Sequence, residues 1–196
     1  MALNARIAEL LDRGLLALEL QIARERREKL LAYIALLQTL SARMSVTSAK
    51  TPEEWVETVL LDSLVLTKWI KGTGVLCDVG SGFGLPAIPV TIAEPGVRVV
   101  LIERGTKRCS YLKRFLHDFA IAGDVRCEDV DSVERVDANW FTARAFAEPK
   151  TWRRTAAKIA PQGSTVFTLH AGKELPGERY VLPFSGRVRS VELWTP

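Results

Sequence analysis

The chain has 196 residues, of which 47% are hydrophobic and 26% are charged, and its formal net charge is +4. This balance suits one globular domain with a sizeable core, and no stretch is apolar for long enough to cross a bilayer. The charged N-terminal residues exclude a signal peptide. Three widely spaced cysteines, Cys77, Cys109 and Cys127, argue against a disulfide framework or a zinc site and indicate a reducing, cytoplasmic setting. The mildly basic charge permits a polyanionic partner without requiring one.

The first part of the chain has the periodicity of helices. Apolar residues recur at helical spacing between residues 7 and 15 and again between 30 and 37. The charge-rich stretch 23–29 between them is interpreted as a solvated helix surface. Thr51, Pro52 and the glutamates that follow have the pattern of an N-cap, an N1 proline and an acidic first turn, so another helix is predicted from there towards Ile70.

Strands alternate with helices from Val75 onward. Strands are predicted within 75–79, 97–103, 124–130, 138–144 and 164–170, with further β-like segments at 179–184 and 187–194, and helices within 85–93, 107–123 and 151–163. This alternation indicates βαβ units and therefore an α/β fold with a mostly parallel, twisted sheet covered on both faces. We expect two parts, an N-terminal helical extension over 1–50 and a Rossmann-like domain over 51–196.

A glycine-rich loop, "DVGSGFGLPAIP", follows the first predicted strand. A phosphate-binding P-loop needs Lys and Ser or Thr after the last glycine, but Leu85 and Pro86 stand there. The dinucleotide fingerprint G-x-G-x-x-G also differs from the spacing of Gly80, Gly82 and Gly84, and Pro86 removes one amide that could bind a pyrophosphate. An uncharged or cationic ligand that lies flat against the glycines fits this loop better.

Glu103 ends the second predicted strand, at the edge of the sheet where open α/β folds bind ligands. A carboxylate there can accept hydrogen bonds from two vicinal ribose hydroxyls. The combination of D-x-G-x-G-x-G after strand one and an acid after strand two is the pattern of methyltransferases that use S-adenosylmethionine. Gly80 and Gly82 would admit the methionine part of that cofactor. A glycine turn without a ligand is the weaker interpretation, although Asp78 taken alone could equally be a loop cap.

Four segments together resemble the bacterial small-subunit (16S) ribosomal RNA guanine-N7 methyltransferase family, also called the glucose-inhibited division protein B family. They are "MSVTSAKTPEEWVETVLLDSL" (44–64), "DVGSGFGLPAIP" (78–89), "TKR" (106–108) and "ARAFA" (143–147). The Leu-Pro step after the glycines is the most distinctive of these features. The resemblance spans roughly residues 30–170 and implies a Rossmann-like S-adenosylmethionine-dependent methyltransferase that acts on N7 of a guanine in 16S ribosomal RNA.

The glycine motif and its acidic partner predict a set of cofactor contacts, to which the resemblance adds others. The motif gives Asp78, Gly80, Ser81, Gly82 and Glu103, and the resemblance implies Leu85, Val130, Asp131 and Arg144. The resemblance places Arg144 at the mouth shared by cofactor and substrate, which makes it the candidate catalytic residue. Candidate RNA contacts are Lys107, Arg108, Arg114 and His170, and no metal site is expected. We expect a cytoplasmic monomer that acts on 16S ribosomal RNA or the small ribosomal subunit and binds no membrane.

Several positions depart from the family pattern. Thr58 and Val59 replace a basic residue and a histidine, Ala87 replaces a glycine, and His170-Ala171-Gly172 replaces Lys-Gly after the fifth strand. The segment 170–182 is also short for the helix usual there. These changes leave open a methyltransferase for another RNA or a small molecule, and a non-catalytic cofactor- or RNA-binding relative. A nicotinamide-dependent oxidoreductase is a further alternative, against which Leu85-Pro86 argues. Guanine N7 carries a lone pair and no proton, so the lack of an evident catalytic couple does not count against methyl transfer.

Overall fold

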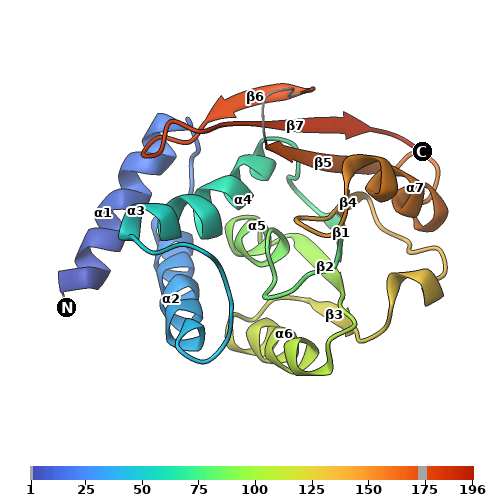
Figure 1. Ribbon diagram of the computed structural model, residues 1–196, viewed down its shortest axis with the longest axis horizontal. Coiled ribbons are helices and arrows are strands. Elements are labelled where there is room, and N and C mark those ends of the chain that lie inside the picture. Colours follow the sequence, from blue (N-terminus) through green and yellow to red (C-terminus); the bar gives the residue numbers. More distant parts are fainter. Residues whose placement is uncertain (1, 172–175) are drawn as a thin grey trace.

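The computed structural model describes residues 2–171 and 176–196; Met1 and residues 172–175, which include the predicted departure at Gly172, lie outside this description. Two N-terminal helices, α1 (Ala2–Ala17) and α2 (Arg24–Ser41), lie beside the sheet rather than apart from it (Figure 1). Ile7, Leu11, Leu30 and Ile34 are buried in the same hydrophobic cluster as the sheet strands. The N-terminal helices are therefore part of the main core.

The third helical region is one continuous run whose pitch changes three times. It consists of α3 (Pro52–Trp55), the π-helix η1 (Val56–Leu61), α4 (Asp62–Leu64) and the 3-10 helix η2 (Val65–Lys68). The predicted start is confirmed, because the Thr51 hydroxyl and the Glu54 side chain form a capping box around Pro52. The sequence predicted a regular helix, and the π-helical turn in its middle is a feature that apolar periodicity does not reveal.

Within the described residues, seven strands form one sheet in the order β3-β2-β1-β4-β5-β7-β6. The strands are β1 (Gly74–Val79), β2 (Val97–Ile102), β3 (Gly123–Arg126), β4 (Trp140–Thr142), β5 (Thr165–Ala171), β6 (Glu178–Val181) and β7 (Val188–Trp194). The first five are parallel, whereas β7 pairs antiparallel with both β5 and β6. The mostly parallel sheet predicted from the sequence is confirmed. The strand order reverses between β1 and β4, which is where α/β folds of this kind bind ligands.

Helices cover both faces of the sheet (Figure 1). The first face packs against the N-terminal helices, α5 (Ala87–Ala93) and α6 (Thr106–Asp118), and the second packs against α7 (Pro149–Ile159) and the 3-10 turn η3 (Val130–Ser132). Neighbouring residues of β2 point to opposite faces, since Val99 and Leu101 belong to the first cluster and Ile102 to the second. This alternation explains why β2 is apolar at almost every position.

One expectation about the cysteines is wrong. Cys109, in the first turns of α6, forms a disulfide with Cys127, which directly follows β3, while Cys77 is free and buried. The two Cα atoms are 5.8 Å apart although 18 positions separate them in the chain, because α6 packs back onto β3. An odd number of cysteines leaves one unpaired but does not prevent the other two from meeting.

Candidate functional site

The glycine loop turns sharply at the carboxyl end of β1. Gly80 and Gly82 have φ values of +67° and +58°, a left-handed conformation that side chains with a Cβ disfavour. The loop is fixed to the neighbouring strand, because the amides of Gly80 and Ser81 both donate to the carbonyl of Ile102, at 2.9 and 3.1 Å. On its other side, the buried hydroxyl of Tyr33 in α2 donates to the carbonyl of Phe83 at 2.6 Å. The loop is therefore held from the sheet and from the N-terminal helices.

Glu103 stands next to this loop at the end of β2. Its carboxylate accepts hydrogen bonds from the amides of Gly82, at 3.0 Å, and Gly105, at 2.8 Å, and the Arg108 guanidinium lies 3.6 Å away. The side chain is only 4% exposed. A carboxylate has about four acceptor positions, so two amides leave capacity for further donors from a ligand. The predicted proximity of Glu103 to the glycine loop is thus seen in the structure.

Asp78 is a fully buried carboxylate at the end of β1. Its Oδ1 accepts a hydrogen bond from the Thr142 hydroxyl in β4 at 2.8 Å, while Oδ2 has no hydrogen-bond partner within the described part of the chain. Burial raises the pKa of this carboxyl to about 7, and the Thr142 hydroxyl opposes that rise by stabilising the charged form. A buried carboxylate with one unpaired oxygen is well suited to a cationic partner.

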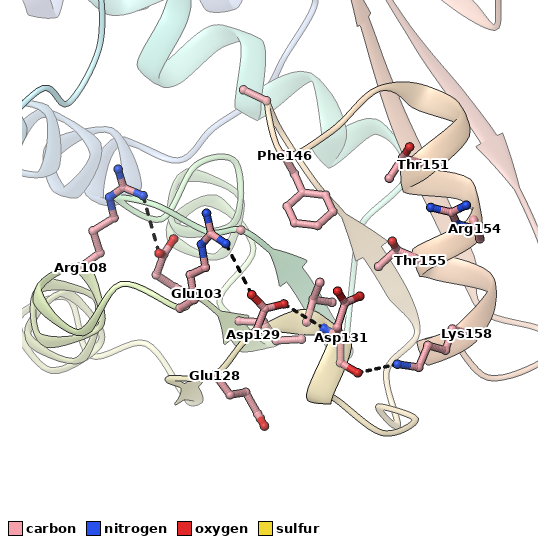
Figure 2. A pocket seen from close by; sticks show the side chains of 15 residues that line it. Glu103, Arg108, Glu128, Asp129, Asp131, Phe146, Thr151, Arg154, Thr155 and Lys158 are labelled. Carbon is pink, nitrogen blue, oxygen red and sulfur yellow. Dashed lines mark hydrogen bonds and ion pairs between the residues drawn. The ribbon is translucent and has the colours of Figure 1, made fainter.

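A cavity of about 680 Å³ opens beside the loop, at the carboxyl ends of the parallel strands. Such a volume is in the usual range for small-molecule sites. In Figure 2, Glu103 and Arg108 lie on one side, residues of α7 on the opposite side, and the Phe146 ring between them. The lining residues are Gly80, Ile102, Glu103, Arg104, Arg108, Glu128, Asp129, Val130, Asp131, Ala145, Phe146, Thr151, Arg154, Thr155 and Lys158.

Hydrogen bonds and an ion pair hold the wall of the cavity that residues 128–131 form. Asp129 caps the η3 turn by accepting from the Asp131 amide at 3.1 Å, and its other oxygen lies 3.6 Å from the Arg104 guanidinium. Lys158 of α7 donates to the Asp131 carbonyl at 2.7 Å, which joins the turn to the helix (Figure 2). Cys127, bonded to Cys109, immediately precedes this wall.

Asp129 and Phe146 are among the cavity residues that sequence reasoning missed. Asp129 comes three residues after the end of β3, whereas Glu103 directly follows β2, so a search for acids shortly after each strand could have found it. The Phe146 ring lies against Gly80, where a Cβ built on the glycine would come within 2.8 Å of Phe146 Cδ2. This contact joins segments far apart in the chain, and no local pattern indicates it.

The predicted site residues separate into two groups. The structure brings Gly80, Glu103, Val130 and Asp131 together around the cavity. The other predicted residues do not line it: Asp78, Ser81 and Leu85 are buried, Gly82 is half-buried with its amide donating to Glu103, and the Arg144 side chain points instead to Thr58 and Asp62.

The candidate RNA contacts also differ in their surroundings. Lys107 and Arg108 are exposed on the first turn of α6, and Arg108 reaches the cavity. Arg114 lies further along the same helix and pairs with Asp118 at 3.1 Å. His170 is 11% exposed and lies 3.1 Å from a carboxylate oxygen of Glu192, so one of its ring nitrogens already has a partner.

The departures from the family pattern fall mostly inside the molecule. Val59 and Ala87 are fully buried in the hydrophobic core, so neither changes an exposed surface. Thr58 offers its main-chain carbonyl to Arg144 at 2.7 Å, a contact that does not depend on the side chain at that position. Within residues 2–171 and 176–196, no helix is both long and apolar enough to cross a bilayer, and no cluster of metal-ligating side chains occurs.

Solved structures show the same fold. An RNA methyltransferase from Salinibacter ruber, determined in complex with S-adenosyl-L-homocysteine, aligns with a TM-score of 0.54 at 22% identity and covers 75% of this chain and 93% of its own. A tRNA m1G37 methyltransferase from M. jannaschii aligns with a TM-score of 0.55 at 14% identity over 75% of this chain and 51% of its own. At these identities the likeness concerns the fold alone, and it confirms the Rossmann-like architecture.

Sequence relatives identify the family. A protein from Neisseria meningitidis serogroup C (strain 053442), named ribosomal RNA small subunit methyltransferase G, is 34% identical over 142 residues, which are 71% of this chain and 68% of the relative. A protein of the same name from Anaeromyxobacter dehalogenans is 32% identical, with 95% of this chain and 96% of the relative aligned. Residues 26–180 match the family model GidB, described as rRNA small subunit methyltransferase G. The chain belongs to this family of small-subunit ribosomal RNA methyltransferases.

Proposed function

We propose that this enzyme transfers a methyl group from S-adenosylmethionine to N7 of a guanine in 16S ribosomal RNA and that the cavity beside Gly80 is the cofactor site. The observation that carries the proposal is the extent of the family match. Residues 26–180 include every residue that lines the cavity, from Gly80 to Lys158.

The residues present fit a sulfonium cofactor. Asp78 does not line the cavity, but its buried carboxyl has an unpaired oxygen two residues before Gly80, and a cationic ligand beside Gly80 would favour the charged form of this carboxyl. Glu103 and Asp129, at the ends of adjacent strands, are the candidates for the ribose hydroxyls. Val130 and Asp131 supply an apolar surface and a polar group for the adenine. Arg144 is a candidate near the mouth by its place in the chain, since Ala145 and Phe146, which follow it, line the cavity, although its own side chain contacts Thr58 and Asp62.

The proposed reaction needs little acid–base catalysis from the protein. When bound, the cofactor supplies an electrophilic methyl group on a cationic sulfur. Guanine N7 has an in-plane lone pair and no proton, so no residue has to act as a general base. The chain's contribution is to hold both reactants in line, and orientation of this kind is worth about 7–11 kcal/mol in well-aligned model reactions. The target base must be unpaired or turned out of its stack to enter the cavity.

Basic side chains beside the cavity suit an RNA substrate. Arg104, Arg108, Arg154 and Lys158 line it, and Lys107 is exposed next to Arg108. They can contact phosphates near the target base, which positions the RNA without reading its sequence. The ribosomal particle can then supply the remaining selectivity. The alternatives of another RNA or a small-molecule substrate are not favoured by the family match.

The direct test is methylation of small ribosomal subunits that lack the modification. Purified enzyme and radiolabelled S-adenosylmethionine are incubated with these subunits, and the product is mapped by borohydride reduction and aniline cleavage, which break RNA at N7-methylguanine. We expect one cleavage site in 16S RNA. Label incorporated elsewhere than at a guanine N7 would overturn the proposed reaction.

A pair of glycine variants tests the proposed cofactor site. In Gly80→Val the new side chain meets the Phe146 ring at the cavity, whereas Gly163 has a similar positive φ, +86°, with nothing within 4 Å of an added Cβ. Both variants carry comparable backbone strain. We therefore expect calorimetric binding of S-adenosylhomocysteine to be lost in Gly80→Val and kept in Gly163→Val. Equal affinities in the two variants would place the cofactor elsewhere.

A further inference from the structure

The turn that follows β4 enters the cavity in a conformation that needs support. Ala145 has a φ of +54°, in the left-handed region that alanine seldom occupies, and both Ala145 and Phe146 line the cavity. Strained backbone of this kind persists where surrounding contacts determine it, and it is frequent at functional sites. The Phe146 ring packs against Trp152, and Arg144, the residue immediately before the turn, supplies its polar contacts.

The Arg144 side chain does not line the cavity but contacts two residues of the third helical region. Its Nη1 donates to the main-chain carbonyl of Thr58 at 2.7 Å and lies 3.9 Å from Oδ2 of Asp62. The side chain is 19% exposed, so these contacts are partly shielded from water. Arg144 therefore joins the cavity turn to the helical run over residues 52–68.

The π-helix η1 makes both partners of Arg144 available. The Asp62 amide donates to the carbonyls of Glu57 and Leu60 and not to that of Thr58, four residues before it, as it would in an α-helix. The Thr58 carbonyl is thereby released from that bond and accepts from Arg144. The wider turn also changes the direction of Asp62 relative to Glu57. The Asp62 carboxylate lies beside the Arg144 guanidinium.

Asp62 is fixed in turn by the C-terminal strands. Its Oδ1 accepts from the Tyr180 hydroxyl of β6 at 2.5 Å and lies 3.8 Å from Nε of Arg189 in β7. Its side chain is 13% exposed. One carboxylate thus lies near two guanidiniums, with Oδ2 towards Arg144 and Oδ1 towards Arg189, and its negative charge offsets the repulsion between them.

We infer that Asp62 is a positioning residue of the methyl-transfer site: held by Tyr180, it fixes Arg144 and, through Arg144, the turn that places Phe146 against Gly80. The role of this turn in cofactor binding rests on the proposed function. The positioning itself concerns only the protein's own contacts and can be measured without a ligand.

Hydrogen exchange of the enzyme without ligand tests the positioning. Tyr180→Phe removes the hydroxyl that holds Asp62 and keeps the ring, and Asp62→Asn removes the charge that faces Arg144. We expect the peptide amides of 143–148 to exchange about five- to tenfold faster in each variant, the effect of losing one partly buried hydrogen bond. The control is Glu57→Gln, since Glu57 lies on the π-helix next to Asp62 and accepts from the amides of Phe184 and Ser185 without touching Arg144.

In the control, faster exchange is expected around residues 184–187 and not at 143–148. Unchanged exchange at 143–148 in both Tyr180→Phe and Asp62→Asn would overturn the inference. Equal acceleration there in Glu57→Gln would also overturn it, because loosening of the C-terminal strands in general would then be the cause.

A double-mutant cycle on cofactor affinity adds a functional readout. We expect Tyr180→Phe to weaken calorimetric binding of S-adenosylhomocysteine about fivefold in the wild-type background and to have no further effect in Arg144→Met, because Tyr180 acts through Arg144. If Tyr180→Phe weakens binding equally in both backgrounds, Tyr180 does not act through Arg144, and that part of the inference is overturned. A wild-type enzyme that binds no S-adenosylhomocysteine would instead overturn the proposed function, and hydrogen exchange would still decide the positioning role.

Discussion

Asp78 allows a quantitative prediction, because the residue that suits a cationic ligand also destabilises the ligand-free fold. Burial raises its pKa from an ordinary value of 3.8 to about 7. Between these two values the folded protein keeps a proton that the unfolded chain has released. The free energy of unfolding therefore falls as the pH rises from about 4 to about 7, and the full penalty applies above pH 7.

Substitution of Asp78 by Asn removes this pH-dependent penalty. The asparagine side chain is neutral at every pH, and its oxygen could still accept from Thr142, while its amide group would face the place of the unpaired Oδ2. That unpaired donor costs about 1–3 kcal/mol at any pH. Between pH 5 and pH 7, titration of Asp78 lowers the unfolding free energy of the wild type by about 1.4 kcal/mol per pH unit and leaves that of the variant unchanged. The difference between the two proteins therefore shifts by about 3 kcal/mol in favour of the variant.

The assay is urea unfolding of wild type and Asp78→Asn from pH 5 to pH 8.5. We expect the difference in unfolding free energy to shift by about 3 kcal/mol in favour of the variant across this range, with other titrating groups cancelling between the two proteins. Asp137→Asn, at an exposed position, shows what the same substitution does without burial. A pH-independent difference for Asp78→Asn would refute the argument. The variant should also bind S-adenosylmethionine more weakly, which separates stability from function.

Three further predictions test how the site is held. Tyr33→Phe leaves the carbonyl of Phe83 without its buried donor and should lower the free energy of unfolding by about 1–3 kcal/mol in urea titrations, with a smaller loss counting against the role of Tyr33 in holding the glycine loop. Glu103→Gln places an amide group where two backbone N–H groups need acceptors, so affinity for S-adenosylhomocysteine should fall at least about tenfold by calorimetry; unchanged affinity would remove Glu103 from the site. Reduction of the Cys109–Cys127 bond, monitored by alkylation and mass spectrometry, should lower the unfolding free energy by about 3 kcal/mol, and detection of three free thiols before reduction would show that the bond is absent.

The sequence alone determined the sheet, the glycine turn and the acid beside it. Strands of a parallel sheet are buried on both faces, so they appear as short apolar runs between helical patterns, and the ends of such runs mark the ligand edge. Glu103 could be assigned for this reason, because a residue directly after a strand keeps its place at the sheet edge. The Leu85-Pro86 step was equally local and excluded the phosphate-binding loops.

Tertiary structure decided everything that depends on contacts between distant segments. Tyr33 reaches the glycine loop from α2, Phe146 lies on Gly80, and Asp62 meets Arg144 and Tyr180 from a distant part of the chain. The π-helix that precedes Asp62 has no signature in apolar spacing, because it changes the hydrogen-bond pattern of the backbone and not the type of residue. The Cys109–Cys127 bond was missed for a related reason: the spacing of cysteines does not show which helix packs onto which strand. Local patterns fix which residues stand at the edge of the sheet, and only packing determines which of them face the cavity and what holds them there.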